Sequence, residues 1–230
     1  GLKEIHVLPP KTMDAANINI PGDFSSAAFF VLAALITPGS DLTLMNIGIN
    51  KTRIALLEVL KGMGADIKLS NVINEYEPCA DISIRASKLK GITLNPKLVP
   101  NLIDELPVLF IAASLAEGET IIRGAEELRE KESDRLEAMS NSLKLLGVKF
   151  KIYDDGIDIQ GLNQEVHTSN SGMPFEASRI NSFGDHRIAM TSAIACTRAN
   201  EKSYIEDTKN VTTSFPNFLE ICEEVGLDIK

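Results

Sequence analysis

The chain has 230 residues, of which 44% are hydrophobic, and its 32 acidic against 23 basic side chains give a formal charge of −9. This composition supports a folded core but argues against a nucleic-acid partner, because neutralising phosphates requires a basic face. The longest apolar run, residues 27–36, is too short to cross a bilayer, and no signal peptide opens the chain. We therefore expect a cytoplasmic protein without a membrane partner.

Cysteine and histidine usage predicts reduced thiols and no metal. The three cysteines form no CxxC pair, and none of the three histidines lies near a cysteine at ligand spacing. We expect no structural metal and no cofactor.

Three segments in chain order share one pattern: an aspartate, an apolar helix of small residues, a short strand and a second helix. The leading residues are Asp23, Asp104 and Asp185, which follow one another at a constant interval of 81 residues. The second helix of each segment ends at a glycine, as is typical of the left-handed residue after a helix. These glycines are Gly64, Gly147 and Gly226.

The stretch after each glycine alternates apolar and polar residues, and residues 148–161 contain an Asp-Asp-Gly hairpin signal. The repeating unit is thus β-α-β-α-β-β. The units cover about residues 16–90, 91–165 and 174–230. We expect an α/β fold in which residues 1–230 form one pseudo-threefold domain, with sheet lying between buried and exposed helices.

The first helix of each unit has almost no polar stripe, which predicts burial on all sides. These helices cover residues 27–36, 106–116 and 187–197. By the pseudo-symmetry they run parallel, so their N-termini converge at one end of the domain. Free N–H groups and partial positive charge at that end favour an anion.

The densest cluster of charges, residues 129–135, lies where the middle unit's second helix begins. Lys131 and Arg135 are four apart and would share a helix face, and Glu132 would adjoin Arg135. The simpler interpretation is a solvated helix start capped by the serine or the aspartate of this segment. Because residues 48–57 and 209–218, the equivalent junctions, lack this density, the fold does not demand it, which favours a functional role.

Two helix starts allow both a structural and a functional interpretation. Asp185 fits an N-cap followed by two solvated side chains, but His186 and Arg187 would also suit a covering anionic ligand. Residues 104–107 fit a capped helix with a first-turn proline. The alternative makes Asp104 a general base at the rim of a cleft.

Five strings, IPGDFSSAAFF, IDELP, KESDR, GDHRIAM and TSFP, occur in this order along nearly the whole chain. Together they resemble the C-terminal half of the EPSP synthase (3-phosphoshikimate 1-carboxyvinyltransferase) family. Members of that family consist of two three-unit domains that face each other across a cleft. The resemblance implies that this chain is about half of such an enzyme, and that the missing N-terminal domain is its partner.

The resemblance implies transfer of the enolpyruvyl group from phosphoenolpyruvate to the 5-hydroxyl of shikimate 3-phosphate, with release of phosphate. This reaction belongs to the shikimate pathway of aromatic amino acid biosynthesis. By resemblance, Asp104 takes the proton of the hydroxyl and Glu132 transfers the proton at the methylene carbon. Lys131 lies between the substrates. Arg135 and Arg187 bind the carboxylate and phosphate of phosphoenolpyruvate, with the histidine of the third unit, His186, beside them.

One departure from the family and two competing interpretations remain. Some relatives carry a phosphate-binding lysine just before the Phe-Pro pair, whereas here residues 211–214 precede Phe215 and the nearest lysine is Lys209. A UDP-N-acetylglucosamine enolpyruvyltransferase would share the fold and the donor but not the acceptor. A non-catalytic folded module is the alternative from another class.

Overall fold

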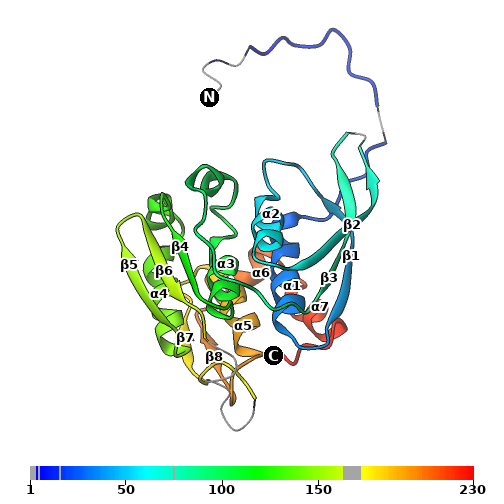
Figure 1. Cartoon of the computed structure of the whole chain (residues 1–230). Coiled ribbons are helices and arrows are strands. Elements are labelled where there is room, and N and C mark those ends of the chain that lie inside the picture. The colour runs from blue at the N-terminus through cyan, green and yellow to red at the C-terminus, as the bar shows by residue number, and fades with distance from the viewer. Residues whose placement is uncertain (1–3, 5, 16, 75, 163–171) are drawn as a thin grey trace.

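The computed structural model has three apolar helices, α1, α3 and α5, at its centre (Figure 1). It describes residues 4, 6–15, 17–74, 76–162 and 172–230. The helices are α1 (Phe24–Ile36), α2 (Ala55–Gly62), α3 (Leu106–Ser114), α4 (Arg135–Leu145), α5 (His186–Cys196), α6 (Val211–Ser214) and α7 (Phe218–Glu224), with 3₁₀ helices η1 (Pro96–Asn101) and η2 (Glu126–Glu130). The strands are β1 (Asp41–Gly48), β2 (Asp66–Ile73), β3 (Cys79–Arg85), β4 (Glu119–Ile122), β5 (Lys149–Tyr153), β6 (Gly156–Gln160), β7 (Arg179–Asn181) and β8 (Tyr204–Glu206).

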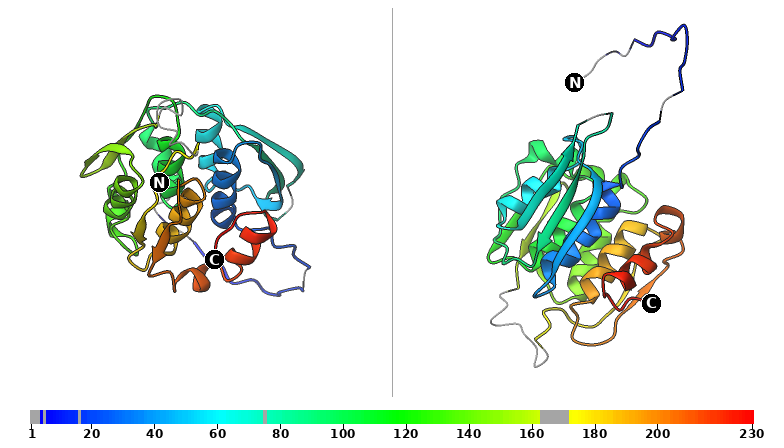
Figure 2. Two further views of the ribbon diagram at one scale, coloured as in Figure 1. Left: turned by 90° about the horizontal axis from the view of Figure 1, so that it is seen from below. Right: turned by 90° about the vertical axis from the view of Figure 1, so that its right-hand side faces the viewer.

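In the part of the chain that the structure describes, the strands form three small sheets, whereas one sheet between buried and exposed helices was expected. Two are antiparallel, in the orders β1-β3-β2 and β4-β6-β5, and the third pairs β7 with β8 in parallel. Figure 2 shows the sheets arranged around the three central helices. This follows from the sequence, because a helix that is apolar all round needs cover on every side.

The predicted repeat is visible in the order of the elements. The first two units each run helix, strand, helix and two-stranded hairpin, and the expected turn joins β5 to β6. All three glycines after the second helices have positive φ, between 82° and 100°. The predicted helix ends are therefore confirmed, and so is the α/β fold.

The repeat is less regular than predicted at its edges. In the first two units the leading strand is reduced to isolated parallel bridges, among them Gly22 to Ile47 and Thr93 to Ile121, whereas β7 is a true strand. Residues 227–230, expected as a strand, form none. A short segment without a hairpin partner has no ladder to join. The predicted unit limits at residue 16 and residues 163–165 lie outside the described residues.

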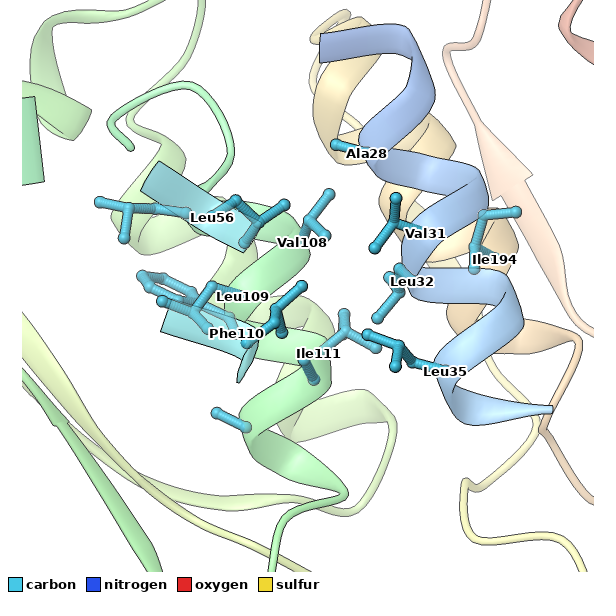
Figure 3. Close-up of a cluster of buried hydrophobic side chains, with 14 of the residues drawn as sticks. Ala28, Val31, Leu32, Leu35, Leu56, Val108, Leu109, Phe110, Ile111 and Ile194 are labelled. Atoms are coloured by element: carbon cyan, nitrogen blue, oxygen red, sulfur yellow. The ribbon is translucent and has the colours of Figure 1, made fainter. Parts of the chain in front are cut away.

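The three central helices are packed against one another. Leu32 and Leu35 of α1 point toward Val108 and Ile111 of α3, and Ile194 of α5 lies on the other flank of α1 (Figure 3). Every residue of α3 is buried. Such close packing fixes the relative positions of the helix ends, where the charged residues lie.

Two further expectations concern membranes and thiols. Within the described residues, no helix combines the length and apolar character that crossing a membrane requires. The three cysteines are free thiols.

Candidate active site

The N-termini of α1, α3 and α5 meet at one end of the domain. Asp23 Oδ2 accepts the main-chain N–H of Ser26 at 2.8 Å, and Asp185 Oδ1 accepts that of Arg187 at 2.9 Å. Both aspartates thus cap their helices, which for Asp185 confirms the structural interpretation of this helix start. Arg187 Nη1 donates to the main-chain oxygen of Asp104 at 3.1 Å, which joins the starts of α5 and α3.

Asp104 departs from the capping pattern of its two repeats. The N-cap of α3 is Glu105, whose side chain makes no cap hydrogen bond. The Asp104 carboxylate faces three cations from other segments. The distances are 3.1 Å to Arg135 Nη1, 3.8 Å to Arg187 Nη2 and 3.9 Å to Lys131 Nζ. The prediction of a simple cap is therefore wrong for Asp104.

The environment of Asp104 sets its protonation. Burial raises the pKa of the carboxyl, but Arg187, Arg135 and Lys131 lower it more, so that the pKa lies below its ordinary value. Asp104 is therefore ionised at neutral pH. In this state its carboxylate can accept a hydrogen bond from a substrate hydroxyl.

Arg135 lies beneath the surface, with only 1% of its side chain exposed. Its Nε donates to Asp185 Oδ2 at 2.8 Å, its Nη1 contacts Asp104, and its Nη2 is bound to Glu132. Ser133 Oγ donates to the same oxygen of Asp185 at 3.1 Å. One guanidinium thus holds three carboxylates, two from the second unit and one from the start of α5.

Lys131 and Glu132 precede the helix on which the sequence placed them. Helix α4 begins at Arg135 with Asp134 as N-cap, which confirms the predicted cap. The helical-face argument for Lys131 and Arg135 is therefore wrong, yet the two side chains still meet at Asp104. Glu132 is half exposed, at 50%, so its carboxylate is accessible to a ligand.

His186 and Arg187 form the first turn of α5. Burial and the adjacent Arg187 lower the pKa of His186 below its ordinary value, so the imidazole is neutral at neutral pH. The Arg187 side chain is 14% exposed. All six predicted site residues therefore lie in one cluster: Asp104, Lys131, Glu132, Arg135, His186 and Arg187.

The sequence missed four members of this cluster. Ser25 and Arg53 reach it from the first unit, Glu105 lies at its centre, and Asp185 binds Arg135 besides capping α5. The contacts that join them to other units span 50 to 82 positions, and even Arg53 and Ser25, within the first unit, are 28 positions apart, so local patterns do not reveal them. One sequence signal could have found three of them: Ser25 and Glu105 come just after a repeating aspartate, and Asp185 is one.

Part of the cluster reaches solvent, since the side chains of Glu132, Asp104 and Lys131 are 50%, 26% and 23% exposed. Two hollows of about 350 and 360 Å³ lie elsewhere, one between α4 and β7 and one beside the β2–β3 hairpin. Among the described residues, no group of three histidine, cysteine, aspartate or glutamate side chains is placed to hold a metal ion.

Nearly the whole chain matches the sequence model of a known protein family. The model of EPSP synthase (3-phosphoshikimate 1-carboxyvinyltransferase) matches residues 2–222. The chain belongs to the EPSP synthase family. The resemblance carried by the five sequence strings is confirmed.

Individual relatives of the EPSP synthase family agree with this assignment. The chain is 47% identical over 219 residues to 3-phosphoshikimate 1-carboxyvinyltransferase of Coxiella burnetii (strain RSA 493), covering 95% of this chain and 48% of that protein. It is also 47% identical over 219 residues to the protein of the same name from Methylococcus capsulatus, with the same coverage. The chain thus spans about half the length of these relatives.

Solved structures extend the comparison to the fold. EPSP synthase from Acinetobacter baumannii superposes with a TM-score of 0.85 at 45% identity, over 92% of this chain and 47% of that chain. The enolpyruvyl transferase NikO from Streptomyces tendae gives a TM-score of 0.69 at 15% identity, over 93% and 45%. The second likeness shows the shared fold alone.

Proposed function

We propose that this chain forms one side of the active site of an EPSP synthase. The complete enzyme transfers the enolpyruvyl group of phosphoenolpyruvate to the 5-hydroxyl of shikimate 3-phosphate and releases phosphate. The observation that carries the proposal is the cluster in which three cations face Asp104 where three helix N-termini meet. Both substrates are polyanions, so their binding requires such cations. Cytoplasmic location is part of the proposal.

Binding of phosphoenolpyruvate would involve Arg187, His186 and Lys131, whose side chains belong to the cluster around Asp104. Arg135 can join them by exchanging a partner. Its Nη2 is bound to Glu132, which lies three residues away and is half exposed, whereas its Nε and Nη1 hold Asp185 and Asp104. An incoming carboxylate or phosphate takes the place of Glu132 on Arg135, and this frees Glu132.

Proton transfer would use the two carboxylates. Asp104 takes the proton of the 5-hydroxyl, whose oxygen attacks the central carbon of phosphoenolpyruvate. Glu132, which takes up a proton after its release from Arg135, gives that proton to the methylene carbon. The tetrahedral ketal then loses phosphate, which carries away the proton held by Asp104, and Glu132 takes a proton back from the methyl group. Substrate anions partly neutralise the cations that lower the pKa of Asp104, so its pKa rises and the carboxylate becomes a better base.

The second side of the site would come from the other half of the family's length. An open cluster cannot orient two substrates or exclude water, and both effects contribute much of the rate in such reactions. We therefore expect the chain alone to fold without turning over. Turnover by the 230-residue chain alone would contradict this half-site assignment.

The test is reconstitution. The chain is mixed with a separately expressed N-terminal half of a close relative, and phosphate release is measured with phosphoenolpyruvate and shikimate 3-phosphate. Activity in the mixture, and in neither half alone, supports the proposal. A parallel reaction with UDP-N-acetylglucosamine tests the other acceptor. If two folded, associated halves remain silent with shikimate 3-phosphate, the proposal is wrong, and a non-catalytic module becomes the better interpretation.

A further inference from the structure

Glu105 lies where side chains from all three units meet. The hydroxyl of Ser25, in the first turn of α1, donates to Glu105 Oε1 at 2.6 Å. Arg187 Nη1, in the first turn of α5, approaches the same oxygen at 3.5 Å. Arg53 Nη2 donates to Ser25 Oγ at 3.0 Å, so the chain of contacts runs from the first unit to the third.

We propose that Glu105 is a positioning residue of the anion site, which holds Arg187 directly and Arg53 through the hydroxyl of Ser25. Arg53 thereby becomes a further cation of the site. The inference rests on the proposed role of Arg187 in binding a substrate anion. It adds to that role a device that fixes the direction of the guanidinium before the ligand arrives.

The burial of Glu105 argues that its charge has a use. Its side chain is 3% exposed, and burial raises the pKa of the carboxyl above its ordinary value. The same side chain makes no cap hydrogen bond to its own helix, so capping does not account for it. The Ser25 hydroxyl, Arg187 and Arg53 favour the ionised form, whereas Asp104, like burial, opposes it.

The arrangement suits a bidentate arginine. Nη1 of Arg187 is held by the main-chain oxygen of Asp104 and by Glu105, whereas Nη2 lies 3.8 Å from Asp104 Oδ2. Two fixed partners on Nη1 determine the plane of the guanidinium. A planar fork that is already oriented loses less freedom when it binds a carboxylate or a phosphate.

Positioning and plain electrostatics predict opposite results for Glu105→Gln. Removing a carboxylate beside two arginines raises the positive potential, which by itself would strengthen the binding of an anion. Loss of positioning instead weakens the binding of phosphoenolpyruvate. The amide keeps the size of the side chain and its ability to accept the Ser25 hydroxyl, so the variant removes the charge alone.

The first experiment uses the 230-residue chain and requires no turnover. The order of the Arg187 and Arg53 side chains is read from their Nε–Hε NMR signals, assigned by Arg187→Lys and Arg53→Lys. Glu105→Gln should lower the order of both arginine side chains, and Ser25→Ala should lower that of Arg53 alone. Ser26→Ala, which removes the neighbouring hydroxyl that binds Asp23, should change neither. An Arg187 signal as ordered in Glu105→Gln as in the wild type overturns the proposal.

The second experiment uses the reconstituted enzyme. Glu105→Gln should raise the KM for phosphoenolpyruvate about tenfold, the effect of losing one charge-assisted hydrogen bond, while the KM for shikimate 3-phosphate stays unchanged. An unchanged or lower KM for phosphoenolpyruvate overturns the proposal. If Glu105→Gln does not fold, the KM for phosphoenolpyruvate is compared between Ser25→Ala and Ser26→Ala. Only Ser25→Ala should raise it. A silent wild-type mixture contradicts the proposed function, and the NMR result then decides the positioning role separately.

Discussion

Arg135 and Asp185 form an ion pair in which both side chains are almost completely buried, at 1% and 0% exposure, with 2.8 Å between Nε and Oδ2. Arg135 is the first residue of α4, and Asp185 is the N-cap of α5. The pair therefore joins the second unit to the third within the buried part of the candidate active site. Two charges without access to water depend on each other much more than an exposed pair does.

We predict that Asp185→Asn lowers the free energy of unfolding by about 3 kcal/mol, because Arg135 loses the carboxylate at its Nε. The amide oxygen can still cap α5, so the loss reports the charge and not the cap. Urea denaturation measures it. The control is Asp41→Asn at the exposed pair with Arg85, where each side chain is 58% exposed, and the loss should stay below about 1 kcal/mol. Equal losses at the two sites would contradict the interdependence of the buried charges.

We predict that Glu132→Gln separates activity from stability. In the reconstituted enzyme kcat should fall about 100-fold or more, since the amide cannot exchange a proton with the methylene carbon. The free energy of unfolding should change by less than about 1 kcal/mol, because the carboxylate is half exposed. Exposed Glu130, two residues earlier, supplies the control: Glu130→Gln should leave kcat unchanged. A large loss of stability with kcat retained would make Glu132 a structural residue.

Asp104→Asn should likewise lower kcat by about 100-fold or more, because the amide cannot take the proton of the hydroxyl. The repeat supplies a matched control for this variant. Asp23 occupies the equivalent position in the first unit, where it caps α1. Asp23→Ala should reduce stability by about 1 kcal/mol through loss of the cap and leave the KM values unchanged. If Asp104→Asn lowers the free energy of unfolding and leaves kcat unchanged, Asp104 is a structural residue and not the base.

The parts of the fold that the sequence predicted are those with a local cause. Glycine after a helix favours the left-handed conformation wherever it occurs, and a helix without a polar stripe is buried whatever surrounds it. The interval between Asp23, Asp104 and Asp185 then revealed the threefold repeat and the convergence of three helix starts. These inferences need no knowledge of which strands pair.

The parts that the sequence did not predict depend on contacts between units. A single layer of sheet was expected, but the strands pair within their units and form three separate sheets. Glu105 was read as part of a capped helix start because its partners, Ser25 and Arg187, lie 80 and 82 positions away. Equivalent positions in the three repeats carry different side chains. The repeat therefore predicts the backbone of each unit, but not the side-chain contacts between units.

Close contact between two backbones predicts the effect of a single methyl group in the hairpin of the second unit. A Cβ on Gly156 would lie 2.0 Å from the main-chain oxygen of Ile122 on the adjacent strand β4. Gly156→Ala should therefore destabilise the chain by about 2 kcal/mol or more, since the backbone must shift. Gly62, near the end of α2, has open space at the same position, and Gly62→Ala should stabilise by up to about 1 kcal/mol. Thermal unfolding measures both, and a Gly156→Ala variant as stable as the wild type would refute the close approach.

The pKa of His186 offers a test of the anion site that requires no turnover. Burial and then Arg187 lower this pKa, whereas Asp185 and Glu132 act in the opposite direction without reversing the result. The unfolded chain therefore takes up the proton first as pH falls. The stability that neutral His186 provides is fully present above about pH 6.5, the ordinary histidine value, and is lost as the pH falls through the lower folded pKa.

We expect the imidazole Hε1 signal, assigned with His186→Gln, to titrate below the ordinary histidine range in the free chain. Phosphoenolpyruvate bound beside it should raise the pKa, because a nearby anion favours the imidazolium. Adding sodium chloride at the same ionic strength is the control for screening. A pKa that phosphoenolpyruvate leaves unchanged, while the Arg187 signal does shift, would place the ligand on the arginine side of the cluster and remove His186 from the anion site.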